Sequence, residues 1–341
     1  MPLMRHGDKM RATIKDIAEY CKISVGTVDR ALNNRSGISE KTKKKILEAA
    51  EILNYHPNHT GRSLAKGRTM TIGVVCFDLC NNFFPELIDT IEARAKEKGF
   101  FIYLILTHRD FSLEEDGISY LCERQVDGII LFPVGLSQMY INSLKNLGIP
   151  IVTIYNRLDE TFPFVGVNDR RAMEDAVEHL LNKGYRRISY LTPDIAFQRK
   201  QGLNTYTLQQ RLTGYQKGMQ RFNLKAEVLE AGSLEEKLDY FLERQKFDEK
   251  TALLCLCDSY AVKAIEYLRK RNVCIPEQVG IMGYDNIQAL EYIHPRLATI
   301  GYSVRQMGQA VIDILFECMD NPEYFREYLL DYTIIDGDSL I

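Results

Sequence analysis

The sequence predicts an N-terminal all-α helix-turn-helix domain followed by a larger α/β domain built from two lobes. Short amphipathic helical patterns fill the first part of the chain, and after Thr71 apolar runs alternate with helical stretches. The charge divides at the same place: residues 1–70 carry 14 Lys and Arg against 7 Asp and Glu, and residues 71–341 carry 29 against 39. A basic head on an acidic body indicates that the head meets a polyanion.

Three short helices are expected in the head, which we assign to residues 12–57. Thr13 and Asp16 form a capping box at the start of the first helix. Ser24 caps a second helix that runs through Leu32, and Ser39 caps a third. The first two helices are joined by a tight turn, which is typical of a helix-turn-helix.

A hinge and linker are expected over residues 58–70. Residues His59–Ala65 have room for one or two helical turns, but the segment is short and contains Gly61. Glycine costs roughly 1 kcal/mol against alanine inside a helix, and such a short helix is marginal alone. We therefore expect this segment to become ordered only against a partner.

The body, residues 71–341, is expected to form parallel sheets with helical crossovers. We assign the first lobe to about 71–168 plus 301–328 and the second lobe to about 169–300 plus 329–341. Helices are expected at 84–98, 113–124, 169–183, 208–222, 258–271 and 304–319. Strands are expected at Ile72–Phe77, Phe101–Leu106, Gly128–Phe132, Ile151–Tyr155, Ile188–Leu191, Leu253–Cys257 and Val279–Met282, with a further strand after Leu329.

The stretch 14–33 carries the strongest chemical signal in the chain. A helix-turn-helix presents the start of its second helix to a major groove, where the small residues Val25 and Gly26 permit close approach. Ser24 and Thr27 can reach phosphates, and Arg30 can reach a phosphate or a guanine edge. The alternative is a small helical bundle with a solvated basic face.

Residues 12–68 resemble the DNA-binding domain and hinge of the lactose-repressor (LacI/GalR) family of bacterial regulators. The resemblance continues through the body in the same order along the chain. The matching head segments are Ile14–Glu19, Ser24–Asn33, Ser39–Thr42, Leu53–Tyr55, Pro57-Asn58 and Arg62–Ala65. The matching body segments are Phe77–Phe84, Val126–Ile130, Ala176–Arg187, Arg211–Tyr215 and Gly283–Asn286.

This resemblance implies a homodimer that binds a near-palindromic double-stranded operator. The second helix would enter the major groove, and two hinge helices would pair in the minor groove, with Leu64 as the wedge that opens a base step. The DNA-facing residues implied in this way, together with the phosphate contacts above, are Lys15, Ser24, Val25, Gly26, Thr27, Arg30, Asn33, Tyr55, Asn58, Arg62 and Leu64.

Two features of the head depart from the family pattern. Asp29 stands where the family usually has Ser, and a carboxylate there repels phosphate unless it is paired with Arg30 or Arg35. Val25 and Gly26 offer little hydrogen-bonding readout. We therefore expect specificity to depend on Arg30, on Asn33 and on DNA deformability.

The body resembles the type 1 periplasmic-binding-protein fold, in which a ligand sits in the cleft between two hinged lobes. In open α/β sheets, ligands collect at the carboxyl ends of strands. Polyol recognition needs planar bidentate groups and aromatic faces. The candidate effector-binding residues are Asn81, Phe83, Phe84, Asn156, Arg157, Arg211, Cys257, Asp285 and Tyr302. For each of them, a surface ion pair or a core position is the alternative interpretation.

Sugar-binding relatives often have Asp where Asn156 stands, Asn where Cys257 stands and Gln where Tyr302 stands. Those changes remove hydroxyl-binding capacity. We expect a small polar effector, sugar-like or a related metabolite.

No cofactor and no metal are expected. Cys255 and Cys257 lie two residues apart without zinc-ribbon spacing, which favours buried free thiols. The chain has no Walker loop, GxGxxG, HExxH or GxSxG motif, and we therefore expect no enzyme. No run of 18 apolar residues and no secretory signal is present, which favours a cytoplasmic protein without membrane contact.

These observations predict a sequence-specific DNA-binding transcriptional regulator, most simply a repressor, whose operator affinity an effector controls. The sign of the effector's action stays open. The rival interpretations are a solute-binding protein-like sensor, an enzyme with an appended DNA-binding domain, and an architectural DNA-binding protein without a ligand.

Overall fold

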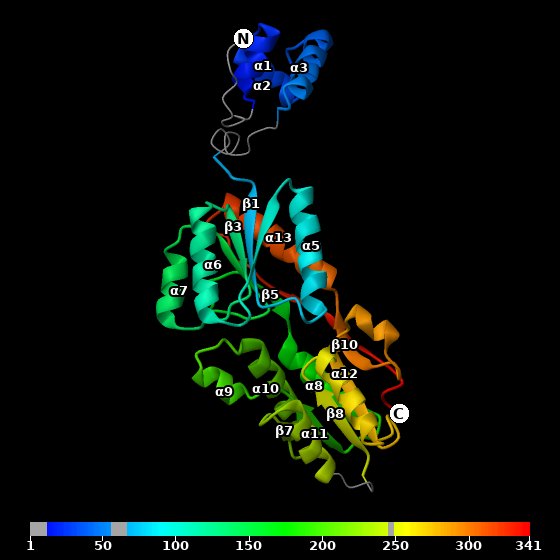
Figure 1. Cartoon of the computed structure of the whole chain (residues 1–341). Coiled ribbons are helices and arrows are strands. Elements are labelled where there is room, and N and C mark those ends of the chain that lie inside the picture. Colours follow the sequence, from blue (N-terminus) through cyan, green and yellow to red (C-terminus); the bar gives the residue numbers. More distant parts are fainter. Residues whose placement is uncertain (1–11, 56–66, 245–248) are drawn as a thin grey trace, which may run out of the picture. The chain divides into compact units, whose positions relative to one another are not determined.

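The computed structural model describes residues 12–55, 67–244 and 249–341, and the chain divides into two compact units, Met1–Thr69 and Met70–Ile341 (Figure 1). The first unit contains α1 (Ile14–Cys21), α2 (Val25–Leu32) and α3 (Glu40–Ile52). The second unit contains two six-stranded sheets, each with helices packed against it. The predicted fold class, a helical head followed by a two-lobed α/β body, is confirmed.

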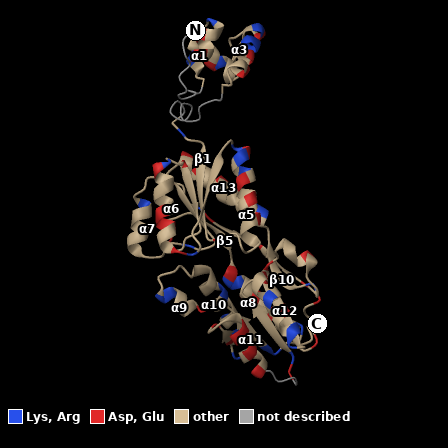
Figure 2. Ribbon diagram, viewed as in Figure 1, with Lys and Arg blue, Asp and Glu red and all other residues tan. Residues whose placement is uncertain are grey.

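The caps that the sequence predicts begin all three helices of the head. At α1 the Thr13 amide donates to Asp16 Oδ2 at 2.6 Å, and the Asp16 amide donates back to Thr13 Oγ1 at 3.4 Å. The helix ends at Lys22, whose φ of 56° turns the chain into α2. The apolar faces of the three helices meet in one small core, formed by Ile17, Ala18, Cys21, Val28, Ala31, Ile46, Ala49 and Ala50. Lys residues gather in the first half of α3, where Lys41, Lys44 and Lys45 are exposed (Figure 2).

The first sheet has the strand order β11-β5-β4-β3-β1-β2, and all its neighbours are parallel. Helix α13 (Val304–Asp320) packs on α5 (Phe83–Glu97) and on this sheet. The other helices of the first lobe are α6 (Phe111–Glu123) and α7 (Gln138–Lys145). Its strands are β1 (Thr71–Cys76), β2 (Phe101–Leu106), β3 (Gly128–Leu131), β4 (Ile151–Ile154), β5 (Phe164–Val167) and β11 (Glu327–Leu330).

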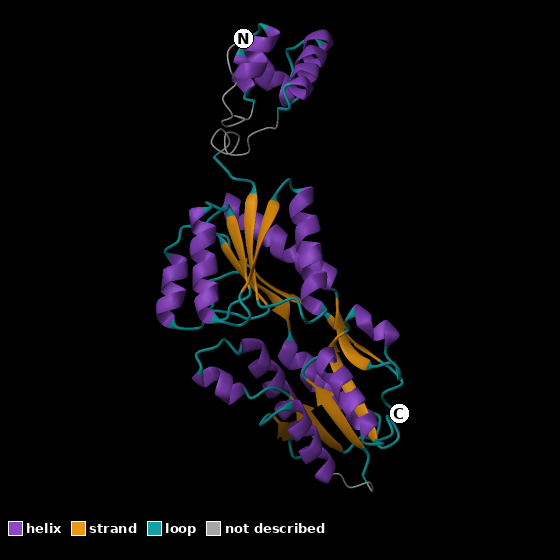
Figure 3. Cartoon of the chain, in the orientation of Figure 1, coloured by secondary structure: helices purple, strands orange, loops and turns teal. Residues whose placement is uncertain are grey.

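The second sheet has the order β12-β10-β9-β8-β6-β7, in which only β12 runs antiparallel to its neighbour. Its strands are β6 (Arg187–Leu191), β7 (Glu227–Leu229), β8 (Thr251–Cys255), β9 (Val279–Asp285), β10 (Ala298–Tyr302) and β12 (Tyr332–Ile335). The helices of this lobe are α8 (Asp169–Asn182), α9 (Ile195–Lys200), α10 (Tyr206–Arg221), α11 (Leu234–Glu243), α12 (Asp258–Lys270) and the 3-10 turn Gln288–Tyr292 (Figure 3).

The chain passes between the two sheets three times. It leaves the first sheet after β5 and enters the second lobe at α8, and it returns after β10 through Ser303 to α13. The last passage lies at Asp331, between β11 and β12. The strand expected after Leu329 is therefore the end of β11 in the first sheet, followed by β12 in the second. Each lobe is assembled from separate pieces of the chain.

Across residues 12–55, 67–244 and 249–341, no helix is long and apolar enough to span a membrane. The same residues contain no group of three or more His, Cys, Asp or Glu side chains that is placed to hold a metal ion.

Candidate DNA-binding surface and interlobe site

The start of α2 presents a small and open surface. Ser24 Oγ accepts the Thr27 amide at 3.2 Å and hydrogen-bonds to Thr27 Oγ1 at 2.8 Å, which fixes both hydroxyls at the N-terminus of the helix. The Val25 side chain is 45% exposed. A Cβ added at Gly26 would meet only Ser24 Oγ, at 4.0 Å, so the fold itself leaves room for a side chain there.

Asp29 is held by two neighbours at the C-terminal end of α2. Asn33 Nδ2 donates to Asp29 Oδ1 at 2.8 Å and to the Asp29 carbonyl at 3.0 Å. The Arg35 guanidinium forms an ion pair with Asp29 Oδ2 at 3.3 Å. Of the two arginines expected near this carboxylate, Arg35 makes the ion pair. Both amide hydrogens of Asn33, which the sequence assigned to DNA readout, point to Asp29.

Of the other predicted DNA-facing residues, three lie within the described part of the chain and three lie outside it. Lys15 and Arg30 are exposed, and Tyr55 is half-buried against the head core. Asn58, Arg62 and Leu64, which the family resemblance assigns to the hinge and the minor groove, lie outside the described residues.

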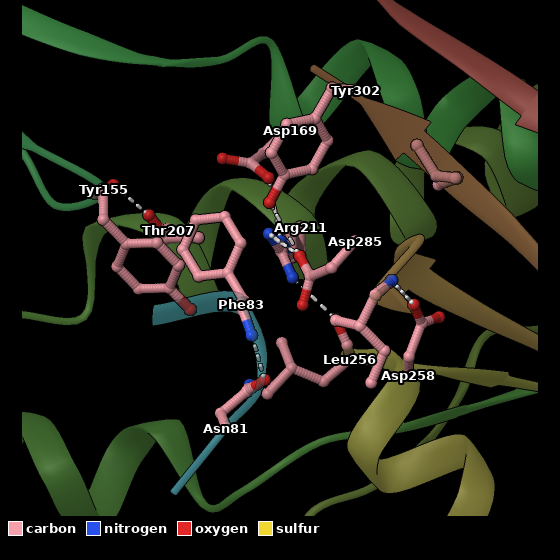
Figure 4. Close-up of polar contacts among 12 residues, drawn as sticks. Asn81, Phe83, Tyr155, Asp169, Thr207, Arg211, Leu256, Asp258, Asp285 and Tyr302 are labelled. Atoms are coloured by element: carbon pink, nitrogen blue, oxygen red, sulfur yellow. Dashed lines mark hydrogen bonds and ion pairs between the residues drawn. The ribbon is translucent and has the colours of Figure 1, made fainter. Parts of the chain in front are cut away.

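Arg211 is the centre of a buried polar cluster in the second lobe (Figure 4). Its side chain is 2% exposed and extends from α10. Nε donates to Asp169 Oδ1 at 2.8 Å, Nη1 donates to the Leu256 carbonyl at 2.7 Å, and Nη2 lies 3.5 Å from Asp285 Oδ1. The guanidinium carbon also lies 3.6 Å from the centre of the Tyr284 ring. One cation therefore joins α8, α10, the end of β9 and the loop before α12. We call Arg211, Asp169, Asp285 and Tyr302 the interlobe cluster, because Tyr302 lies beside Phe83 of the first lobe.

Asp285 stands where β9 ends, with a φ of 110°, and Asn286 follows at 55°. These left-handed conformations turn the chain sharply at the carboxyl end of a strand, which is where strained residues of binding sites are often found. Tyr302 Oη donates to Asp285 Oδ1 at 2.8 Å. Burial raises the pKa of the Asp285 carboxyl to about 6, because loss of hydration outweighs the opposing charge of Arg211.

Aromatic rings of the first lobe reach this cluster. The Phe83 ring centre lies 6.0 Å from that of Tyr302 and 6.1 Å from that of Tyr155. Asn81 Oδ1 accepts the Phe83 amide at 3.1 Å, which positions the ring at the start of α5. Phe83 and Phe84 are both 1% exposed and pack in the same apolar core, with their ring centres 5.2 Å apart.

Asn156 and Arg157 make contacts that fix backbone and neighbouring side chains. Asn156 Nδ2 donates to the carbonyls of Pro133 at 3.3 Å and Asn204 at 3.2 Å, and Asn156 Oδ1 accepts the Thr207 amide at 3.2 Å. The Arg157 Nη1 donates to Glu327 Oε1 at 3.2 Å. Both hydrogens of the Asn156 amide are therefore used within the protein.

Cys257 and Asp258 are buried where β8 leads into α12. Burial raises the pKa of the Cys257 thiol to about 12, so the thiol is protonated at neutral pH. The Asp258 oxygens accept the Thr299 hydroxyl at 2.6 Å and the Ile287 amide at 3.0 Å. Burial also raises the pKa of the Asp258 carboxyl to about 8.

Comparison with known proteins identifies the family. Residues 13–58 match the family model for bacterial regulatory proteins of the lacI family, and residues 177–340 match a periplasmic-binding-protein-like domain. The chain is 33% identical to the HTH-type transcriptional regulator RegA of Clostridium acetobutylicum, over 97% of this chain and 99% of that protein. The chain belongs to the lacI family.

As a lacI-family protein, the chain is a DNA-binding transcriptional regulator of the helix-turn-helix type. It is 28% identical to the HTH-type transcriptional repressor PurR of Aliivibrio salmonicida, over 92% of this chain and 94% of that one. Its fold is similar to that of a lac repressor dimer bound to operator and an anti-inducer, with a TM-score of 0.83, 22% identity and coverage of 97% and 99%. It is also similar to a ribose-bound LacI-family regulator from Enterococcus faecium, with a TM-score of 0.69, 25% identity and coverage of 79% and 98%.

Sequence reasoning missed one member of the lacI-family protein's interlobe cluster. Asp169 is 6% exposed and binds Arg211. It is also the first residue of α8, where the helix dipole favours an acidic side chain. Because that position already explains an Asp, the sequence did not indicate a second role for it. Tyr155, whose ring packs against that of Phe83, was predicted only as the end of a strand. The place of Asp169, two residues after the apolar run 164–167, marks the end of a strand, but no local pattern indicates its contact with Arg211.

Proposed function

We propose that this regulator is a homodimeric repressor that inserts α2 of each protomer into the major groove of a near-palindromic operator. The support is the open start of α2, where Val25 and Gly26 leave space and two ordered hydroxyls face outward. The name of the PurR relative and the operator-bound dimer of the lac repressor agree with this proposal. Two copies of the head double its positive charge, so operator affinity falls steeply with salt.

We further propose that a small polar, sugar-like effector binds beside the interlobe cluster and controls operator affinity. The observation that carries this proposal is the arrangement around Asp285: Tyr302 and Arg211 both approach Oδ1, and no described residue donates to Oδ2. A carboxylate oxygen with remaining acceptor capacity is suited to a ligand hydroxyl. The Phe83 ring of the first lobe packs beside Tyr302 and is the aromatic group that we assign to the C–H surface of the ligand. The ribose bound to the Enterococcus faecium regulator has this chemistry.

The operator arm of the test uses the full chain and a pool of random duplexes. Rounds of selection followed by sequencing are expected to return an inverted repeat, and size measurements of the complex are expected to give two protomers per duplex. Recovery of sequences without two-fold symmetry would contradict the dimeric repressor.

The effector arm uses thermal unfolding with a panel of pentoses, hexoses, polyols and nucleosides, followed by titration of each hit into the protein–operator complex. D285N is the site variant and D313N, which alters a half-exposed carboxylate of α13 paired with Arg94, is its control. We expect a hit to lose at least about tenfold in affinity with D285N and to be unchanged with D313N, because one buried charged hydrogen bond is removed. A hit that binds D285N as tightly as the wild type lies elsewhere.

A further inference from the structure

Three backbone segments meet at one flank of the junction between the lobes. They are the loop 133–135 after β3, the segment 155–157 after β4 and the segment 203–207 before α10, and we call them together the interlobe clasp. Gly135 and Leu203 form an antiparallel bridge, and the Asn204 amide donates to the Val134 carbonyl at 2.7 Å. The side chain of Asn204 donates to the Arg157 carbonyl at 2.9 Å. The clasp thus joins backbone of one lobe directly to backbone of the other.

The clasp continues directly into the helix that carries the cluster arginine. Thr207 lies in the first turn of α10, its hydroxyl donates to the Tyr155 carbonyl, and its amide donates to Asn156 Oδ1 at 3.2 Å. Arg211 follows four residues later on the same helix, and residues four apart share one helix face. A shift of the clasp therefore moves the helix that positions Arg211 against Asp169 and Asp285.

The first-lobe side of the clasp is held by Glu114 of α6. This carboxylate is 0% exposed, and its two oxygens accept the Val134 amide at 2.6 Å and the Gly135 amide at 3.1 Å. The start of the same helix also closes over the loop, because a Cβ at Gly135 would lie 2.2 Å from the Phe111 ring. α6 therefore contacts loop 133–135 both through the Glu114 carboxylate and through the Phe111 ring.

The charged and titratable groups around Glu114 are few. Tyr140 of α7 faces the carboxylate, and Glu115 is its neighbour on α6. Burial raises the pKa of Glu114 to about 7. A buried carboxylate that binds two main-chain amides is costly to desolvate, and it persists where the position of that main chain matters.

We propose that Glu114 is a positioning residue for the interlobe clasp. By fixing the amides of Val134 and Gly135, it presents the Val134 carbonyl and the Gly135 edge to the second lobe, so pairing of the lobes depends on a side chain in the first lobe. The link from lobe pairing to operator affinity rests on the proposed function, whereas the link from Glu114 to lobe pairing does not.

The test measures hydrogen exchange of the full chain, without DNA and without effector, for the wild type, E114Q and E115Q. Glu115 is exposed and adjacent, so E115Q matches the change in composition and charge. We expect exchange at the amides of 134 and 135 and also at those of 204 and 207 to rise at least about tenfold in E114Q, because the glutamine side chain has one acceptor oxygen where Glu114 has two, which lowers the cost of local opening. E115Q is expected to behave as the wild type.

Amide exchange in the second lobe distinguishes a positioning role of Glu114 from a purely local one. Faster exchange confined to residues 134 and 135, an equal rise throughout the chain, or no change would each overturn the proposal. If E114Q does not fold, N204A tests the clasp from the opposite side, since it removes the donor to the Arg157 carbonyl. That variant is expected to accelerate exchange at 134 and 135 in the first lobe, and unchanged exchange there would overturn the proposal. None of these readouts depends on the effector.

Discussion

Asn33 binds Asp29 through both hydrogens of its side-chain amide, one to the carboxylate and one to the main-chain carbonyl. Together with the ion pair to Arg35, this contact keeps a negative charge fixed in the second half of α2. The contact gives Asn33 a structural role besides any role in base readout, because its amide donors are already occupied.

The first prediction concerns that charge. D29N should raise affinity for a random-sequence duplex by roughly two- to tenfold at low salt, because a carboxylate near phosphates is removed from each protomer. Fluorescence anisotropy at several salt concentrations measures this change. E48Q, an exposed position on α3, is the control for a change of net charge alone. A gain with E48Q equal to that with D29N would show that Asp29 does not face the DNA.

A second prediction uses the open space at Gly26. G26A should stabilise the head by about 0.5–1 kcal/mol, since glycine inside a helix is less favourable than alanine. It should nevertheless weaken binding to a selected operator, because the added methyl group blocks close approach to the groove. Urea unfolding and anisotropy give the two numbers. G37A is the contrast, because Gly37 has a φ of 94° and should lose stability on substitution. A G26A protein with unchanged operator affinity would contradict the close approach.

The third prediction concerns the cation of the interlobe cluster. R211A should reduce the free energy of unfolding by about 3–5 kcal/mol, because Asp169 and Asp285 would be left buried without their cation. R221A, on the same helix, breaks an exposed ion pair with Glu178 and should cost no more than about 1 kcal/mol. Urea titration of both variants makes the comparison. Similar losses in the two would mean that the buried cluster contributes little to stability.

A fourth prediction follows from Asp258, whose pKa is raised from 3.8 to about 8 in the folded protein. The folded state holds its proton more tightly than the unfolded state, so this group's contribution is complete below about pH 4 and is lost as the pH rises through 8. The free energy of unfolding of D258N should therefore fall less between pH 5 and pH 8.5 than that of the wild type. D116N, at an exposed position, should follow the wild type. Parallel pH profiles for D258N and the wild type would show that the carboxyl titrates normally.

Local patterns predicted the head because its signals lie within three or four residues. The capping pair Thr13 and Asp16, and the hydroxyls of Ser24 and Thr27, make the contacts that their spacing indicates. The longer apolar runs of the body also became strands, with bounds within three residues of those expected. Three further strands were not expected: β5, which contains Gly166 and follows Pro163, β7, with three residues, and β10. Pairing with strands that are distant in the sequence stabilises them, and such pairing leaves no local pattern.

The candidate site was predictable only in part for the same reason. Arg211 and Asp285 were expected, but Asp169 lies 42 residues from Arg211 along the chain, and nothing in its own neighbourhood indicates that contact. Asn156 was expected to face an effector, which stays a prediction, and the sequence did not indicate that its amide hydrogens bind the carbonyls of Pro133 and Asn204. That outcome depends on how the two lobes meet, which no pattern along one strand records.

The three passages of the chain between the sheets have a consequence for shortened versions of the protein. β11 and β12 are edge strands of different sheets, and both come after α13. A stop codon after Asp320 would therefore strip one strand from each lobe at once and expose two unpaired edges. Conversely, no continuous segment of the chain forms one complete lobe by itself. The two lobes can therefore be fused to another protein or exchanged by recombination only together.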